Sequence, residues 1–229
     1  MAKENQSNML ANLLGECLHK SLRLYFYNIQ TDSHQKDPFA PLYQHLDQFF
    51  RTMKKSGKFK GKRINVEGWT QKQIENWVMG AVRRMVKYLE YEQISWFQEE
   101  WSLDMIYMDK TGRYVVPLGQ PDLIAYSRRR QAYLVLDFKT AVSTENYLSR
   151  QSGGGPGRRD KLLGYAFGAR QKLRFEKGWN MTPIIIGYVV FIREKVRKGR
   201  MPKMEVLAQE TSLGRLNKWK QRYVNRLKK

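Results

Sequence analysis

The sequence is poor in cysteine and has no long apolar segment. A single cysteine among 229 residues excludes an internal disulfide and a zinc or iron–sulfur site built from several cysteines. No apolar run approaches the roughly 20 residues of a membrane-spanning helix. The first ten residues, MAKENQSNML, also lack the apolar core of a signal peptide. These absences predict an intracellular, cytoplasmic protein that makes no use of a membrane.

Acidic residues are scarce as well. The chain has 21 Asp and Glu against 42 Lys and Arg, which gives a formal net charge of +21. Such an excess favours a polyanionic partner, and nucleic acid is the commonest one. A hydrophobic content of 41% and an aromatic content of 13% are typical of a globular protein. We therefore expect a single domain over residues 1–229 with a basic, nucleic-acid-binding surface.

The apolar pattern predicts helices in the first part of the chain and strands after it. Helical spacing is found at 7–27, 42–53, 70–98, 160–177 and 212–227, and strand-like runs at 100–108, 113–122, 123–126, 132–138, 183–193 and 204–209. Ser7 and Thr70 are predicted to cap the first and third helices. The pattern indicates an α/β protein in which residues 1–99 are mainly helical and residues 100–229 form a sheet with flanking helices.

Two strand-like runs between Gly119 and Thr140, GQPDLIAYSRRRQAYLVLDFKT, are joined by three arginines. A hairpin centred between Arg129 and Arg130 places Asp122 directly across from Asp137, because both are equidistant from that centre. Side chains alternate along a strand, so Asp137 projects on the same side as the lysine two residues later. The loop lacks the Asn-Gly or Gly that tight hairpins prefer.

This arrangement would bring two carboxylates and the ammonium of Lys139 to one point. Carboxylate oxygens are hard ligands suited to Mg²⁺ or Mn²⁺, which activate water and neutralise charge on a reacting phosphate. The alternative is an ordinary hairpin with solvated charges at its ends. Glu99 and Glu100, at the start of the first predicted strand, are expected at the surface, and a supplementary place in the metal shell is the alternative.

The pair Pro121-Asp122, followed by Asp137-Phe138-Lys139, resembles the core motif of the PD-(D/E)XK nucleases. Gly119 before the aspartate and Thr140 after the lysine are similar to the RecB-type branch. The segment LLGECLH, which contains Gly15 and His19, resembles the Gly-x-x-x-His helix of that branch. A lone histidine on a helix is more often structural, so the resemblance is what gives His19 a candidate role.

The resemblance implies a restriction-endonuclease-like mixed β-sheet core flanked by helices, with an N-terminal helical elaboration. It implies that His19, Asp122, Asp137 and the main-chain carbonyl of Phe138 hold Mg²⁺ or Mn²⁺. Lys139 would then position or activate the attacking water. The branch members that carry a cysteine-ligated iron–sulfur cluster differ from this chain, which lacks those cysteines.

The same resemblance bears on the helix predicted at 160–177. The family usually carries Gln-x-x-x-Tyr there. In this chain Tyr165 matches the tyrosine, whereas Lys161 occupies the position of the glutamine. Both would orient substrate, although Tyr165 is almost as well explained as a core aromatic residue. Further contacts with nucleic acid are expected from cations in loops: Arg129, Arg158, Arg159, Lys58 and Lys60. For Lys58 and Lys60 a solvated loop is the alternative.

These expectations describe a metal-dependent deoxyribonuclease, RecB-like and acting as an exonuclease on single strands or ends, in a prokaryotic or viral-host setting. A helicase or recombination partner would act in trans. Two alternatives stay open: a non-catalytic basic protein that binds nucleic acid, and a metal-dependent endonuclease that acts on RNA.

Overall fold

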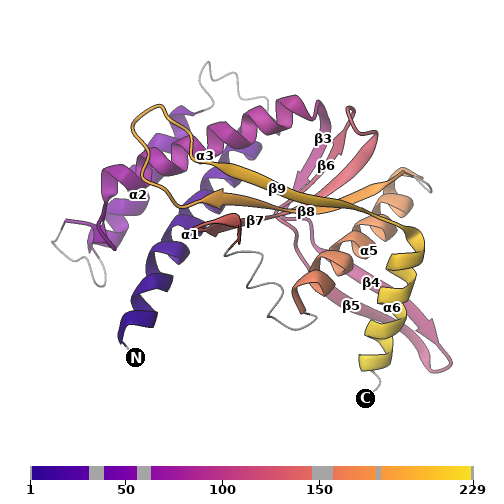
Figure 1. The fold of residues 1–229 in the computed structure, drawn as a ribbon. Helices are drawn as coiled ribbons and strands as arrows, with labels where there is room; N and C mark the ends of the chain where they lie inside the picture. Colours follow the sequence, from indigo (N-terminus) through magenta and orange to yellow (C-terminus); the bar gives the residue numbers. More distant parts are fainter. Residues whose placement is uncertain (1, 31–38, 56–62, 146–156, 179–181, 228–229) are drawn as a thin grey trace. The chain divides into compact units, whose positions relative to one another are not determined.

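The computed structural model describes residues 2–30, 39–55, 63–145, 157–178 and 182–227, and shows a mixed α/β protein (Figure 1). The helices of this part are α1 (Ala2–Gln30), α2 (Ala40–Lys55), α3 (Gln71–Tyr91), α5 (Gly157–Lys177) and α6 (Leu213–Leu227). The strands are β1 (Asn65–Val66), β2 (Trp69–Thr70), β3 (Ile94–Glu99), β4 (Leu103–Asp109), β5 (Gly112–Gly119), β6 (Leu123–Ser127), β7 (Ala132–Ala141), β8 (Ile184–Ile192) and β9 (Met204–Thr211). The predicted α/β class, with a sheet core, flanking helices and a helical N-terminal part, is confirmed.

The central sheet has five strands in the order β3-β6-β7-β8-β9. Both the β3–β6 and the β6–β7 pairs are antiparallel. Strands β1 and β2 form a small separate hairpin, and β4 and β5 form a second one. None of the described helices is long and apolar enough to cross a membrane.

The chain divides into two compact units that are each assembled from several segments. The first comprises Met1–Tyr88, Lys139–Thr144 and Val190–Glu205, and the second comprises Leu89–Phe138, Glu145–Val189 and Val206–Lys229. Strands β7 and β8 therefore contribute residues to both units. The boundary does not follow the division at residue 99 that the sequence pattern indicates.

In the first unit, the core is built from one face each of α1, α2 and α3. Side chains such as Leu14, Leu46 and Trp77 are fully buried. The indole N–H of Trp77 donates a hydrogen bond to the carbonyl oxygen of Ile192 at 2.9 Å, which ties α3 to the end of β8. The predicted cap of α3 is confirmed, because Thr70 and Gln73 form a reciprocal capping box. The cap predicted at Ser7 is wrong, since α1 begins at Ala2.

In the second unit, the β6–β7 hairpin has the register that the sequence predicts. Leu123 pairs with Leu136 and Tyr126 pairs with Tyr133, so the centre lies between Arg129 and Arg130. Nearly every side chain of both strands is buried, on both faces. This explains why the two runs are apolar throughout rather than alternating.

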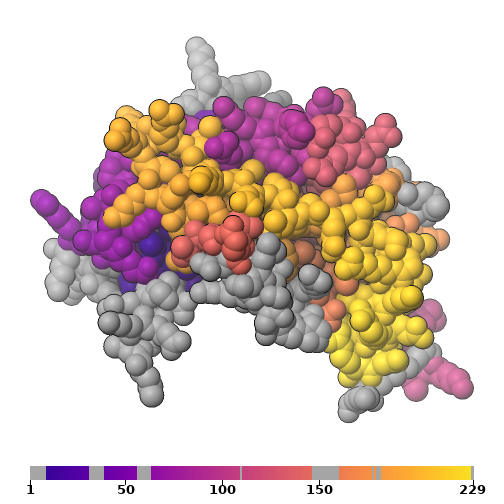
Figure 2. Space-filling model, viewed as in Figure 1, coloured from indigo at the N-terminus to yellow at the C-terminus, as the bar shows by residue number. Residues whose placement is uncertain are grey.

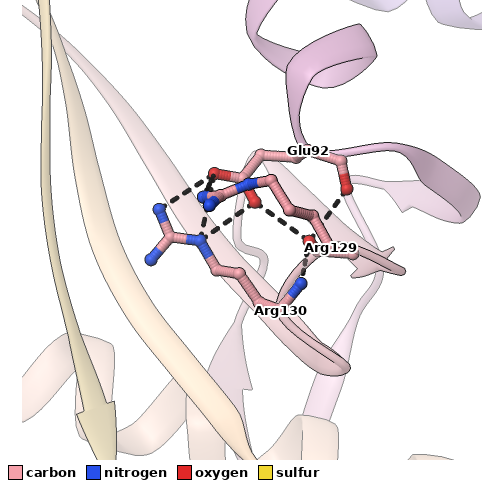
Figure 3. A network of polar contacts seen from close by, with 4 residues as sticks. Glu92, Arg129 and Arg130 are labelled. Carbon is pink, nitrogen blue, oxygen red and sulfur yellow. Dashed lines mark hydrogen bonds and ion pairs between the residues drawn. The ribbon is translucent and has the colours of Figure 1, made fainter.

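The hairpin turn is held by a buried carboxylate from another part of the chain. Glu92 is fully buried and accepts hydrogen bonds from the guanidinium groups of Arg129 and Arg130 at 2.8–3.0 Å (Figure 3). The hydroxyl of Ser127 lies 2.9 Å from a carboxylate oxygen of Glu92, and accepts the amide N–H of Arg130. Gln131 adopts a left-handed conformation with φ of 49°. These contacts stabilise the turn, although the loop contains no glycine.

The same region corrects the predicted helix over 70–98. Helix α3 ends at Tyr91, Gln93 turns the chain with φ of 51°, and β3 begins at Ile94. The first strand of the five-stranded sheet, β3, therefore precedes the strand predicted at 100–108, which corresponds to β4. The reason is the burial of Glu92, whose partners lie more than 30 residues later in the sequence.

Helix α5 packs against both α6 and the β4–β5 hairpin within the second unit. Close approach is made by glycine: a Cβ atom on Gly164 would lie 3.1 Å from the ring of Trp219, and one on Gly168 would lie 2.9 Å from Leu103. The side-chain amide of Gln171 bonds both the N–H and the carbonyl of Ile106, at 3.2 Å each. This amide satisfies one residue of the β4 backbone as a neighbouring strand would.

Two helical glycines of the first unit should respond oppositely to substitution. A Cβ atom on Gly80 would overlap the carbonyl oxygen of Arg200 and lie 3.0 Å from Pro202, whereas one on Gly15 meets no described atom within 4 Å. We expect Gly80→Ala to lower the free energy of unfolding by about 1–3 kcal/mol. Gly15→Ala should raise it by up to about 1 kcal/mol through helix propensity. Urea denaturation of both variants tests this, and equal effects would contradict the packing described.

The Glu92 cluster predicts a pH-dependent contribution to stability. Burial alone would raise the pKa of Glu92, but hydrogen bonds from Arg130, Arg129 and Ser127 outweigh it and hold that pKa below the ordinary value of 4.5. The stabilisation is therefore complete above about pH 4.5 and is lost as the pH falls through the lower pKa of the folded state. We expect Glu92→Gln to cost about 1–3 kcal/mol at neutral pH, with a smaller difference from wild type in acid.

Denaturation curves measured from neutral to acidic pH provide the readout for Glu92→Gln. The exposed neighbour Glu90 offers a matched control, because Glu90→Gln removes the same charge without disturbing the cluster. A cost for Glu92→Gln that stayed constant down to the lowest pH would show that the carboxylate charge is not what stabilises the turn.

Candidate functional site

The first carboxylate of the candidate site follows a tight turn that ends β5. Gly119 has φ of 96°, in the region that favours glycine, and a Cβ atom there would lie 3.4 Å from the ring and the hydroxyl of Tyr165. Tyr165 is almost fully buried, at 2% exposed. The turn therefore packs on α5, three residues before Asp122. Tyr165 is at once a core aromatic residue and a neighbour of the site.

The second carboxylate lies across the hairpin from the first. One oxygen of Asp122 accepts the main-chain N–H of Phe138 at 2.5 Å. Asp137, the residue before it, is 2% exposed. The hydrogen bond places Asp122 against the segment that carries Asp137, as the predicted register requires. Both carboxylates thus lie at the same end of the hairpin within the second unit.

A lysine from α5 already provides a positive charge at this point. The Lys161 ammonium lies 3.5 Å from Oδ1 of Asp137 and 5.1 Å from the centre of the Tyr165 ring. Burial lowers the pKa of Lys161, but the hydrogen bond to Tyr165 and the charge of Asp137 outweigh it and raise that pKa overall. Half of the Lys161 side chain is exposed, so it has room to move away from the carboxylate.

The donor set fits a small divalent cation. Two carboxylates from one hairpin end, with a cationic nitrogen at ion-pair distance from one of them, show that this surface accommodates positive charge. Mg²⁺ is commonly held by one or two carboxylates, with water and substrate phosphate as the other ligands. In the part of the chain that the structure describes, no group of three or more His, Cys, Asp or Glu residues is positioned to hold a metal.

The first unit contains the two other predicted site residues. Lys139 is two residues beyond Asp137 in β7, and strand alternation directs both side chains to the same face. The next residue, Thr140, donates a hydrogen bond from its hydroxyl to the carbonyl of Ala11 in α1 at 3.4 Å. His19 lies just over two turns further along α1, about 80° around the helix from Ala11. A direct role for His19 at the metal stays a prediction.

Other predicted contacts are placed differently. Arg129 is bound to Glu92 and stacks on Tyr91 at 4.3 Å, so the hairpin turn already accounts for its charge. Arg158 and Arg159 belong to the first turn of α5. Lys58 and Lys60 lie outside the described residues. The structure therefore assembles Asp122, Asp137, Lys161 and Tyr165 in one unit and leaves the loop cations as predictions.

One acid lies in a strand that the sequence analysis does not predict. Glu99 pairs with Leu123 in the β3–β6 ladder, so strand alternation directs its side chain to the opposite face of the sheet from Asp122. Glu99 is half-buried, with its Oε2 atom buried, so it lies less at the surface than expected. The run ISWFQ before it is rich in β-branched and aromatic residues, and this signal could have identified the strand.

No family model matches this chain, and no curated protein matches it. Among solved structures, a chain in the crystal structure of SSO0001 is similar at 12% identity with a TM-score of 0.25. The match covers 63% of this chain and 56% of that one. A similarity this distant adds no argument about fold or function, and it assigns the chain to no family.

Proposed function

We propose that this protein is a divalent-metal-dependent nuclease that hydrolyses phosphodiester bonds in DNA. The observation that carries the proposal is the hairpin register, which brings Asp122 and Asp137 together ahead of Lys139. The resemblance of the motif to RecB-type nucleases favours DNA, with single strands or ends as substrate. The net charge of +21 is suited to the same partner.

In this proposal each residue has a separate task. Asp122 and Asp137 would hold Mg²⁺ or Mn²⁺ with the carbonyl of Phe138. His19 is a further ligand that the resemblance implies, and the described residues do not group it with the two carboxylates. The bound cation would lower the pKa of water and neutralise charge on the phosphate. Lys139, on the same face of β7 as Asp137, orients the attacking water and stabilises the developing negative charge. Lys161 and Tyr165 orient the substrate, with Lys161 leaving Asp137 for a phosphate oxygen.

A non-catalytic nucleic-acid-binding protein is the second candidate, and one contact favours it. Because Lys161 sits 3.5 Å from Asp137, its ammonium could be a permanent counterion in place of a metal. The conservative change Lys161→Gln separates these roles, since it restores the residue type of the motif that this helix resembles.

The proposal predicts that Asp122 has separable structural and chemical roles. In Asp122→Asn the side-chain carbonyl can still accept the Phe138 N–H, whereas the negative charge is lost. We expect this variant to lose metal-dependent cleavage and keep nearly all of its stability. Asp122→Ala should lose cleavage and also about 1–3 kcal/mol, because the Phe138 amide loses its acceptor.

The assay uses end-labelled single- and double-stranded DNA, circular DNA and RNA, each with Mg²⁺, Mn²⁺ or EDTA. Cleavage that requires a metal and disappears in Asp122→Asn supports the proposal, and linear against circular substrates distinguishes exonuclease from endonuclease action. Full activity of purified Asp122→Asn would overturn it. Cleavage confined to RNA would replace DNA as the substrate.

For Lys161, the proposal predicts a loss of substrate affinity rather than of chemistry. Lys161→Gln should keep kcat within about ten-fold of the wild type and raise KM, because the residue contacts the phosphate and not the reacting water. Thermal unfolding of the same variant gives the control. A large fall in the unfolding temperature, with no cleavage by wild type or variant, would indicate a permanent Lys161–Asp137 ion pair and the binding-protein alternative.

A further inference from the structure

The last helix, α6, buries the middle of its apolar side against its own unit, whereas Leu213 and Leu227 at its two ends are about half exposed. Leu216 and Trp219 are no more than 1% exposed. Trp219 packs on Gly164 and Phe167 of α5, the latter with ring centres 5.9 Å apart. Figure 1 shows α5 and α6 side by side, and Figure 2 shows that α6 (yellow) forms part of the molecular surface. Only the outer face of this helix is available to a partner.

The outer face is cationic and contains no acidic residue. The helix sequence, LGRLNKWKQRYVNRL, has five cations and no Asp or Glu. Its exposed residues include two cations one turn apart, flanked by amide side chains: Asn217, Lys218, Gln221, Arg222 and Asn225. We call these five residues the α6 stripe. Amide and cationic side chains are all donors to phosphate oxygens.

Some exposed cations on other helices of the protein are neutralised within their own helix. Lys20 pairs with Glu16 in α1, and Arg51 pairs with Asp47 in α2, each one turn away. Neither Lys218 nor Arg222 forms an ion pair with any residue that the structure describes. The charge of the α6 stripe is therefore uncompensated by its own helix, an arrangement that costs repulsion unless a polyanion covers it.

The chemistry of this face favours a nucleic-acid backbone over a membrane. Helices that lie on membranes insert a continuous exposed apolar side. In α6 the central apolar residues Leu216 and Trp219 are buried, and the exposed Leu213 and Leu227 lie at opposite ends of the helix. The stripe also presents no aromatic ring for base stacking, because Tyr223 is stacked on Trp219 with ring centres 5.0 Å apart. Contacts from this face are limited to phosphates and do not depend on base sequence.

The far end of α6 lies next to the candidate site. Arg226 pairs with Asp160 at 2.9 Å, and Asp160 immediately precedes Lys161, which contacts Asp137. All of these residues belong to the second unit. A strand of nucleic acid that followed the stripe toward the C-terminal end of α6 would be directed to the carboxylates.

We propose that the α6 stripe binds the phosphodiester backbone of duplex DNA and directs the adjoining strand to Asp122 and Asp137. The binding surface stands on its own, whereas the direction toward the carboxylates rests on the proposed nuclease function. None of the loop cations that the sequence analysis names belongs to this surface, which lies on a regular helix.

The test removes the two cations of the stripe. Lys218→Gln with Arg222→Gln keeps good helix formers and lowers the net charge by two. Arg51→Gln with Lys72→Gln is the matched control, because both cations are exposed, lie on other helices and have acidic partners. Affinity of the full chain for a short labelled duplex is measured in EDTA at several salt concentrations, so that no cleavage interferes.

We expect the stripe variant to bind on the order of ten-fold more weakly, with a salt dependence reduced by about two phosphate contacts, and the control to match wild type. Equal losses in the two variants would overturn the proposal, because total charge alone would then explain binding. Unchanged duplex binding by the stripe variant would overturn the proposal too. The same holds if the variant binds duplex DNA as wild type does but binds vesicles of anionic phospholipid more weakly.

Cleavage assays on the same variants separate this proposal from the nuclease assignment. If wild type cleaves DNA and the stripe variant has a raised KM with an unchanged kcat, the stripe and the nuclease function both hold. If no substrate is cut but duplex binding still depends on Lys218 and Arg222, the stripe is confirmed and the nuclease function fails. If cleavage and binding are unaffected in the stripe variant, the nuclease stands and the stripe is rejected.

Discussion

The register of the β6–β7 hairpin is the constraint on which the candidate site depends. Side chains alternate along a strand, so a slip of one residue would send one carboxylate to the opposite face of the sheet from the other. Two features oppose such a slip. The strands are buried on both faces, and the hydrogen bond from Phe138 to Asp122 closes the open end of the hairpin. The Phe138 amide also provides a hydrogen-bond donor to an Asp122 carboxylate oxygen that water would otherwise have to solvate.

The closed end of the hairpin depends on Glu92. A buried carboxylate is costly unless it is both paired and hydrogen-bonded, and here two guanidinium groups and a hydroxyl meet that demand. The arrangement also connects the end of α3 to the turn, so β3 is aligned with β6 from the same point. The two carboxylates at one end of the hairpin are thus linked to the ion cluster at the other end by the strands between them.

The sequence reveals the hairpin because its signals are local. Its apolar runs are of matching length, the motif residues are symmetric about Arg129 and Arg130, and no distant partner is needed to see this. The end of α3 is different. Gln93 takes a left-handed conformation without the glycine or asparagine that would announce it, and Glu92 looks like an ordinary helix residue until its arginine partners are known. The helical spacing of apolar residues therefore continues through β3, although the chain forms a strand there.

The role of a helical glycine cannot be predicted from the local sequence either. Gly15 and Gly80 are alike in sequence, each inside a helix, but one faces open space and the other meets the carbonyl of Arg200. Their difference is set by segments far away in the chain. The same is true of the cations. Arg129 is paired with the buried Glu92, whereas the cations of the α6 stripe are exposed and have no acidic partner among the described residues. Composition identifies the excess of positive charge, and only packing shows which part of it a partner can reach.

The most direct test of the central claim is a Mn²⁺ titration of the protein without DNA, followed by calorimetry or electron paramagnetic resonance. Wild type, Asp122→Asn and Asp137→Asn would be compared, with thermal unfolding as the check that each is folded. If the two carboxylates hold the metal, wild type binds Mn²⁺ and both variants bind it far more weakly. Three superimposable titrations would contradict the claim, because the hairpin end would then hold no metal.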